Sequence, residues 1–205
     1  DDGKVTVTDT NDAGGDEGTD TLESVEQLKF GDEGPIGVHV VQDGDSLRDV
    51  IGNDAKEGDI VLVGPVSFGE DDAEEGSASG PIVVDKEGLT IQGPGFGISG
   101  ANRSAEDTEE AVIKNQLVIK ANDVSFDGFT LDLAGVDLTT NSQGEMLRIS
   151  DGADNVTVEN NIVQNGNGDN LPEYEGLGGI VAFGGNSKNS VDNIAIKDNL
   201  VQNLD

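Results

Sequence analysis

Carboxylates are the most abundant side chains in this sequence that could do chemistry, and some of them recur at equivalent places in a repeated segment. Four five-residue segments superimpose, and their fourth positions are Gln92, Asp127, Glu159 and Lys197. If these segments are parallel strands stacked about 4.8 Å apart, Asp127 and Glu159 are adjacent like charges in one outward column. A Ca²⁺ ion between the two carboxylates would relieve their repulsion, and so would simple solvation. Both interpretations stay open at this point.

Acid–base catalysis would need a basic group close to such a carboxylate cluster. Arg148 and Lys197 are the candidates, whereas Arg103 falls in an irregular stretch. For each of the two, an ion pair with a surface carboxylate is the favoured explanation. The single histidine, His39, precedes a predicted helix and reads as an ordinary strand residue, and the single tyrosine, Tyr174, lies in an acidic loop. The sequence therefore assigns no catalytic residue, and it leaves Arg148 and Lys197 as candidates.

The overall charge excludes some classes of partner. Among 205 residues, 42 are acidic and 11 are basic, which gives a formal net charge of −31. Such a charge repels nucleic acid and anionic membranes, and no run reaches the roughly 18 apolar residues of a membrane span. The acidity fits either specific Ca²⁺ sites or solubility in a saline medium. Disulfides and thiol catalysis are excluded because there is no cysteine.

A short helix is predicted at about 46–55, ahead of the first buried strand. Ser46 can cap it, with Asp49 three residues later in a variant of the capping box. Leu47, Val50 and Ile51 then fall at helical spacing and form an apolar face. Such a helix would cover the open apolar end that a stack of repeats otherwise exposes.

The repeated segments predict how the strands are arranged. They begin at residues 89, 124, 156 and 194, so successive starts differ by 35, 32 and 38 residues. Short alternating strands with similar residue types at equivalent positions favour an all-β, right-handed parallel β-helix, a solenoid, over a sandwich. Further strands are predicted within 117–120, 146–149 and 179–183. Asn161 and Asn199 share one register after the strand, where stacked amides can bond to each other and to the turn backbone.

Several stretches together resemble a known superfamily. They are GDSLRDVIGNDAKEGDIVLVGPVSF, GLTIQGPGFGISGANRS, ANDVSFDGFTL and DNVTVENNIVQN. They resemble pectate-lyase-like right-handed β-helices and, more closely, the β-helix repeat regions of large secreted bacterial proteins. The resemblance covers most of a domain that we place at 35–205, read as the N-terminal part of a longer β-helix. It implies this fold, but the scaffold hosts both enzymes and non-catalytic proteins.

Residues 1–34 are predicted to form a separate acidic β appendage or linker. The run GTDTL at 18–22, with Val25, Glu26, Leu28 and Phe30 after it, resembles the closing stretch of calcium-binding RTX-type repeats. This resemblance implies Ca²⁺, with Asp16 and Asp20 as candidate ligands. The glycine spacing before Asp20 is one residue longer than the calcium-binding nonapeptide requires.

From these features we expect a secreted, extracellular or cell-surface β-helix segment associated with Ca²⁺. Its expected role is structural, adhesive or glycan-binding. The alternative is a polysaccharide lyase or C5-epimerase acting on an acidic polysaccharide, as some members of the superfamily are. Expected partners are an extracellular polysaccharide or cell surface and copies of the chain stacked end to end through unpaired strand edges. The candidate metal ligands are Asp127, Glu159, Asp16 and Asp20.

Overall fold

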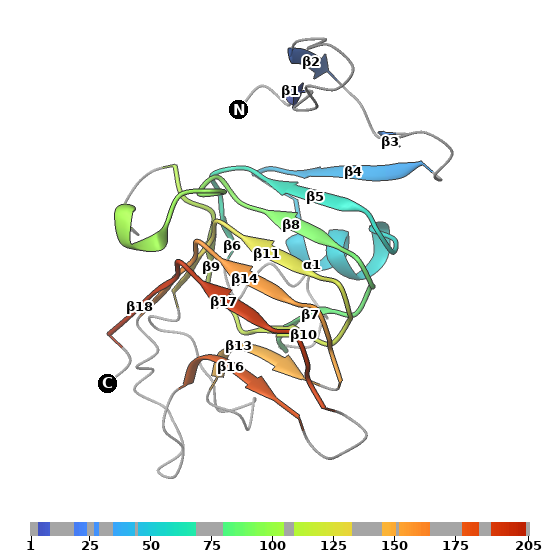
Figure 1. Cartoon of the computed structure of the whole chain (residues 1–205). Coiled ribbons are helices and arrows are strands. Elements are labelled where there is room, and N and C mark those ends of the chain that lie inside the picture. The colour runs from blue at the N-terminus through green and yellow to red at the C-terminus, as the bar shows by residue number, and fades with distance from the viewer. Residues whose placement is uncertain are drawn as a thin grey trace, which may run out of the picture.

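The protein is mostly β-structure, with one short helix (Figure 1). The computed structural model describes residues 4–8, 19–23, 27–28, 35–43, 45–68, 80–104, 109–132, 145–150, 152–164, 178–184 and 190–203. Within these residues the strands form three larger sheets and one antiparallel pair, β1 (Lys4–Thr8) with β2 (Thr19–Glu23).

The three larger sheets have seven, five and four strands. In chain order, the seven-stranded sheet contains β3 (Gln27–Leu28), β4 (Ile36–Val41), β5 (Ile60–Val63), β8 (Thr90–Gln92), β11 (Ser125–Asp127), β14 (Thr157–Glu159) and β17 (Ala195–Lys197). The five-stranded sheet contains β6 (Ser67–Phe68), β9 (Val112–Ile113), β12 (Thr130–Asp132), β15 (Ile162–Gln164) and β18 (Leu200–Gln202). The four-stranded sheet contains β7 (Ile82–Val84), β10 (Leu117–Ile119), β13 (Glu145–Ser150) and β16 (Gly178–Phe183).

From β5 onward the chain visits these sheets in a fixed order, from seven-stranded to five-stranded to four-stranded and back. We call each such passage a coil; the last four coils are β8–β10, β11–β13, β14–β16 and β17–β18. All pairings between coils are parallel, and only β3 and β4 pair in the antiparallel direction within these sheets. The predicted parallel strands are therefore present. The arrangement is compatible with a parallel β-helix.

The core lies between the three sheets because alternate side chains of each strand point inward. In the seven-stranded sheet, Ile91, Phe126 and Val158 are register neighbours and are all fully buried. Phe126 stacks on Phe129 with the ring centroids 4.5 Å apart. Burying each such side chain stabilises the fold by about 1.5–3 kcal/mol.

The corners between strands are formed by residues in the left-handed backbone conformation. One corner column precedes the strands of the seven-stranded sheet and contains Gly58, Gly88, Asp123, Asn155 and Asn193, with φ between 55° and 80°. Glycine, asparagine and aspartate tolerate this conformation better than other residues, which explains their recurrence. Their side chains also bond along the column: Asn155 Nδ2 donates to Asp123 Oδ1 at 2.9 Å, and Asn193 Nδ2 to Asn155 Oδ1 at 3.0 Å.

The short helix expected at about 46–55 is present as α1 (Leu47–Asp49), continued by a π-helical turn, Val50–Asp54. Ser46 caps it, because its Oγ accepts a hydrogen bond from the Asp49 main-chain nitrogen at 3.2 Å. Leu47 and Ile51 are buried in the core and Val50 is partly buried against it. The apolar face of the helix thus extends the core beyond the first strands.

Candidate functional site: the polar column and the segment that covers it

The four polar positions predicted to form a column are register neighbours on the seven-stranded sheet. Asp127 lies opposite Gln92 on one side and Glu159 on the other, and Glu159 lies opposite Lys197. The sequence predicted that all four side chains point outward from the sheet, with Ca²⁺ or solvent relieving the two carboxylates. Asp127 differs, because only 2% of its surface is exposed. The reason is a loop that crosses the column outside the sheet.

Burial and hydrogen bonding act in opposite directions on Asp127. Burial raises the pKa of the Asp127 carboxyl, and the nearby charge of Glu159 raises the pKa further. Hydrogen bonds from Asn160 and from the main-chain N–H of Gly97 oppose the rise in pKa, as does the charge of Arg103. The Asn160 bond, from Nδ2 to Asp127 Oδ1, is 2.8 Å long.

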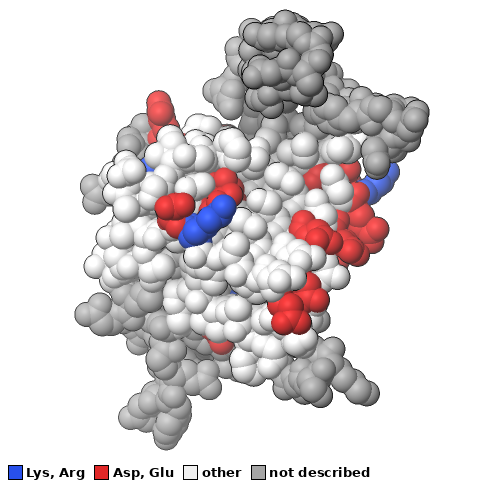
Figure 2. Space-filling view, viewed as in Figure 1, with Lys and Arg blue, Asp and Glu red and all other residues white. Residues whose placement is uncertain are grey.

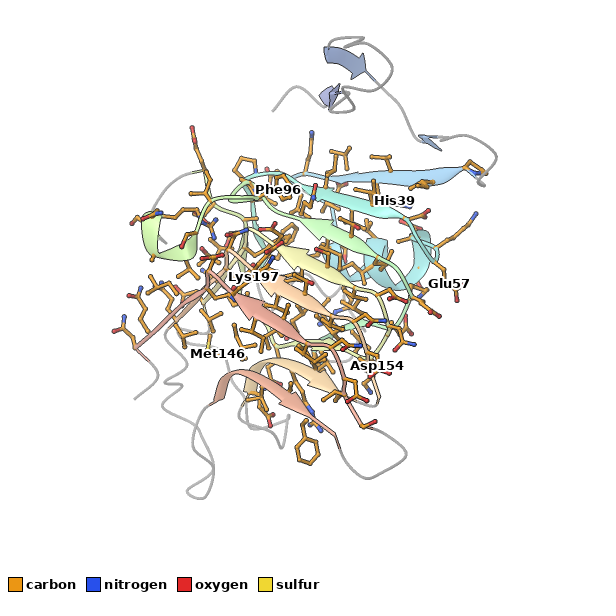
Figure 3. All side chains as sticks on the ribbon, in the orientation of Figure 1. His39, Glu57, Phe96, Met146, Asp154 and Lys197 are labelled. Carbon is orange, nitrogen blue, oxygen red and sulfur yellow. The ribbon has the colours of Figure 1, made fainter. Side chains whose placement is uncertain are left out.

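Glu159 is neutralised differently, by an ammonium group from the next coil. Lys197 Nζ lies 2.7 Å from Glu159 Oε2, and this contact raises the pKa of Lys197. Figure 2 shows a basic side chain among acidic ones on this face, at the place where Figure 3 labels Lys197. The column thus relieves the repulsion between Asp127 and Glu159 with an amide and an ammonium group of the protein itself. No group of three or more histidine, aspartate or glutamate side chains placed to hold a metal ion occurs among the described residues.

The loop that covers Asp127 is the segment 93–104, which we call the strap. The strap follows β8 and runs past the corners of the later coils (Figure 1, in green). The Gly95 main-chain nitrogen donates to the carbonyl oxygen of Gly128 at 3.0 Å, and the Gly100 nitrogen donates to that of Asp198 at 2.9 Å. Gly128, Asn160 and Asp198 form a second column of left-handed corners, which follows the strands of the seven-stranded sheet. The two carbonyls belong to this column, in the coils that begin at β11 and β17. The strap therefore connects coils that are not neighbours.

Arg103, near the end of the strap, inserts its guanidinium group between three of these corner carbonyls. Nη1 donates to the carbonyl oxygen of Gly128 at 3.1 Å, and Nη2 donates to those of Phe129 at 3.2 Å and Asn160 at 2.5 Å. Nη1 also contacts both carboxylate oxygens of Glu110, at 3.0 and 2.8 Å. The side chains of Arg103 and Glu110 are only 6% and 5% exposed, so this ion pair is buried.

The electrostatics of this pair favour a structural role. Burial lowers the pKa of Arg103, while the charges of Glu110 and Asp127 raise it. An arginine side chain nevertheless keeps its proton in proteins, so the positive charge is permanent. Glu110 has a further partner, because Thr130 Oγ1 donates to its Oε2 at 2.8 Å. The cation and the carboxylate are thus held by fixed neighbours and are withdrawn from solvent.

Two glycines are required where the strap meets the corners. Gly128 has φ +83°, and a Cβ there would collide with the main-chain nitrogen of Phe96. A Cβ on Gly95 would collide with Nη1 of Arg103. The close approach of the strap to the corner column therefore depends on the absence of side chains at both positions.

A ladder of asparagine amides links the last coils, at the residues expected from the sequence. The Asn161 main-chain nitrogen donates to Asn199 Oδ1 at 2.9 Å, and the Phe129 nitrogen donates to Asn161 Oδ1 at 2.9 Å. Asn161 Nδ2 also donates to Asn199 Oδ1 at 3.0 Å. Asn161 is fully buried, so these bonds satisfy polar groups that water cannot reach.

Comparison with family models, with curated proteins and with solved structures finds no match to this chain. No helix in the described part of the chain is long and apolar enough to cross a membrane.

The two candidate bases lie on different sheets. Lys197 is on β17 and is paired with Glu159, as described above. Arg148 is on β13 of the four-stranded sheet, where Val118 and Val181 are its register neighbours. Its guanidinium carbon lies 5.3 Å from the ring centroid of Phe183, a cation–π contact, and its Nε is buried without a hydrogen-bond partner among the described residues. The structure thus does not bring the two cations into one site.

His39 contacts a carboxylate at the N-terminal end of the sheets. Its Nε2 lies 2.9 Å from Asp59 Oδ2 (Figure 3). Burial raises the pKa of Asp59, but hydrogen bonds from His39 and from the main-chain nitrogens of Lys56 and Gly37 outweigh burial, so the pKa is lowered overall. The pair joins β4 to the turn before β5. The sequence did not indicate the contact between His39 and Asp59, because the two residues are 20 positions apart in different elements.

Some predicted residues lie outside the described part. Asp16 and Tyr174 are not among the described residues, and the backbone of Asp20, on β2, is described without its side chain. The sequence reasoning missed Glu110 and did not place Arg103 in a cluster. No sequence motif marks Arg103 or Glu110. The position of Arg103 directly after a glycine-rich loop is the one feature of the sequence that could have indicated a buried contact there.

Proposed function

We propose that this chain is a right-handed parallel β-helix segment of a secreted bacterial surface protein, with a structural or adhesive role. The observation that carries the proposal is the continuity of polar ladders from coil to coil. The Asn161–Asn199 ladder and the Asp123–Asn155–Asn193 column both run through successive coils with bonds of about the same length. Such ladders fix the register of a stack of strands, as a rigid structural segment requires.

The placement of the charged groups also supports a structural role. Catalysis on a polysaccharide would need an accessible base beside an accessible acid. Arg103 and Glu110 are instead buried against each other, and Arg148 lies over an aromatic ring. Lys197, which is exposed, is paired with Glu159. These contacts pair each of the three cations within the fold, and the Arg103 and Lys197 pairs join one coil to another.

The adhesive part of the proposal rests on the outer face of the seven-stranded sheet. Thr90, Ser125 and Thr157 are register neighbours and partly exposed, so they form a row of hydroxyl groups beside the polar column. A row of donors and acceptors with the spacing of the strands suits an extended glycan. A neutral glycan would bind the row directly, whereas an anionic one would need bridging Ca²⁺ in so acidic a protein.

Turnover assays separate this proposal from a polysaccharide lyase or C5-epimerase. The protein would be incubated with alginate and pectate in the presence of Ca²⁺, while unsaturated products are followed by ultraviolet absorbance and C5 inversion by NMR. We expect no turnover. Activity that disappears in Arg148→Ala or Lys197→Ala would replace the structural role by a catalytic one.

Binding and calcium are tested separately. Co-sedimentation with insoluble polysaccharide is expected to show binding that Thr157→Asp weakens and Lys114→Met leaves unchanged, because Lys114 belongs to neither the hydroxyl row nor the polar column. Binding unaffected by Thr157→Asp would remove the outer face from the proposal.

Thermal melts with Ca²⁺ and with chelator test the proposed calcium association, because a bound ligand raises the melting temperature. Identical melts would remove calcium.

A further inference from the structure

Among the described residues, the core is open at the end of the stack formed by β16, β17 and β18, which are the terminal strands of their sheets. Along the inner column of the seven-stranded sheet, Ile91, Phe126 and Val158 are 0% exposed, whereas Ile196 is 45% exposed. Val201, at the equivalent end of the five-stranded sheet, is 44% exposed. Side chains at positions that are buried in the core of the preceding coils are thus exposed in the last coil.

The four-stranded sheet has the same property. Ala182 is exposed, although its register neighbour Ile149 is fully buried. Phe183, the last residue of β16, is also 50% exposed, but it lies on the outer side of the sheet with Arg148. The apolar surface therefore extends over the terminal strands of all three sheets. The opposite end of the core is covered, because Leu47 and Ile51 of the helix are buried there.

The asparagine ladder shows what the open end lacks. The side-chain oxygen of Asn161 accepts from the main-chain nitrogen of Phe129 in the coil before it, and that of Asn199 accepts from the nitrogen of Asn161. Each coil thus supplies an amide oxygen to the coil that precedes it. The next acceptor in this series would cap the main-chain nitrogen of Asn199, and it has to come from beyond β17.

Two other ladders join the same coils with the donor and the acceptor exchanged. Gln202 Nε2 donates to Gln164 Oε1 at 2.8 Å, and Asn193 Nδ2 donates to Asn155 Oδ1 at 3.0 Å. In both cases the later coil gives an amide N–H to the side-chain oxygen of the earlier one. The occupant of the open end is therefore expected to donate amide N–H groups to Gln202 and Asn193.

We infer that the open end binds one further coil of polypeptide, added in parallel to β16, β17 and β18. This coil carries asparagine or glutamine side chains in register with Asn193, Asn199 and Gln202, and aliphatic side chains in register with Ile196 and Val201. Its apolar side chains close the core, and its amides continue the three ladders. The inference depends on the order of the coils and not on any surface-binding role.

A second copy of this chain does not meet these requirements. A symmetric pair would join the same ends of two copies with their strands antiparallel, so the amide ladders, which run between parallel strands in register, would not continue across it. The side-chain amides of the last coil are directed toward the coil before it, away from such a contact. The other end of a copy is covered by its helix. The chemistry thus favours a further coil over self-association.

The test extends the protein by a coil of known chemistry. A second copy of residues 166–203 is fused directly after Asn203, which repeats the 38-residue offset between Asn161 and Asn199. The added copy carries Lys197→Arg, so that its peptides differ in mass from the original ones. A matched control carries Asn199→Ala and Gln202→Ala in the added copy only. Amide hydrogen exchange of the original residues 195–202 is then measured by mass spectrometry, alongside sedimentation of the unextended protein.

We expect the unextended protein to sediment as a monomer with rapid exchange at 195–202 and slow exchange at 157–164. The extension is expected to slow exchange at 195–202 by about tenfold or more, and the alanine control to slow it less. Slow exchange at 157–164 in every variant establishes that the host is folded. No slowing in the extended protein overturns the inference, as does a dimer of the unextended protein in which 195–202 are already protected. Equal slowing in the alanine control refutes the part assigned to the amides.

Discussion

The Arg103–Glu110 ion pair gives the most direct test of the strap. Arg103→Met preserves the length and much of the apolar stem of the side chain and removes the guanidinium. It leaves the Glu110 carboxylate, 5% exposed, without its cation, and it removes the donors to the carbonyl oxygens of Gly128, Phe129 and Asn160. Removing one member of a buried ion pair costs about 3–5 kcal/mol because the other charge stays buried.

The remaining contacts show how much of this loss can be recovered. The Gly128 oxygen keeps the N–H of Gly95, and the Phe129 oxygen keeps the N–H of Ile162. The main cost is therefore the unpaired carboxylate of Glu110, which Glu110→Gln removes while an oxygen remains for Thr130. We expect the double variant Arg103→Met/Glu110→Gln to recover most of the free energy of unfolding that the single variant loses.

The assay is equilibrium unfolding in urea, followed by circular dichroism. A loss of about 3–5 kcal/mol corresponds to a fall in melting temperature of about 6–20 °C for a chain of this size. Lys114→Met, which removes an exposed cation, is the matched control and should change stability little. A loss below about 1 kcal/mol in Arg103→Met, or a double variant less stable than the single one, would refute the reasoning.

Four further predictions concern single positions. The pKa of Asp59 is lowered, so its contribution to stability is present above the unfolded pKa of 3.8 and is lost as the pH falls through the folded pKa. Asp59→Asn should therefore reduce the stability at neutral pH and weaken its dependence on acid pH, as measured by urea unfolding at several pH values. The pKa of Asp127 is raised, so the stability of the fold declines as the pH rises from 3.8 through the folded pKa, and Asp127→Asn should remove that decline. Identical dependence of stability on pH in Asp59→Asn and Asp127→Asn would contradict the pKa directions given for both residues. Gly128→Ala should destabilise the fold by more than about 1 kcal/mol, whereas Gly52→Ala, with nothing within 4 Å of the added carbon, should be neutral or stabilising in thermal melts. Asn161→Ala should cost about 1–3 kcal/mol in urea unfolding because it leaves a buried main-chain N–H without an acceptor, and a loss within experimental error would remove the ladder from the account.

The sequence predicted those features that repeat locally. Alternation of apolar and polar residues decides which side chain points inward, so the pattern at 156–160 and 194–198 was sufficient to align Val158 with Ile196. The pairing of Asn161 with Asn199 followed from the same alignment. The helix could be placed because Ser46 caps it and its apolar residues lie at helical spacing.

The strap could not be predicted because its contacts join residues far apart in an irregular segment. Arg103 contacts Gly128, 25 residues away, and Asn160, 57 residues away, and no periodicity connects these positions. The burial of Asp127 depends on the strap, so the outward column was predicted in the right register, whereas solvation of Asp127 was wrong for the same reason. Local patterns determine where a strand lies, whereas the path of a long loop depends on surfaces that exist only after the strands have assembled.

The strap also constrains the order in which the chain can reach its final state. The Gly100 N–H finds its acceptor at Asp198, so 198 − 100 = 98 further residues must be made before this bond can form. At about 5–20 residues per second on a ribosome, that interval lasts about 5–20 s. During biosynthesis the strap can therefore dock in two stages. Its contacts with Gly128 can form once β11 and β12 have been made, whereas the bond to Asp198 forms only after β17.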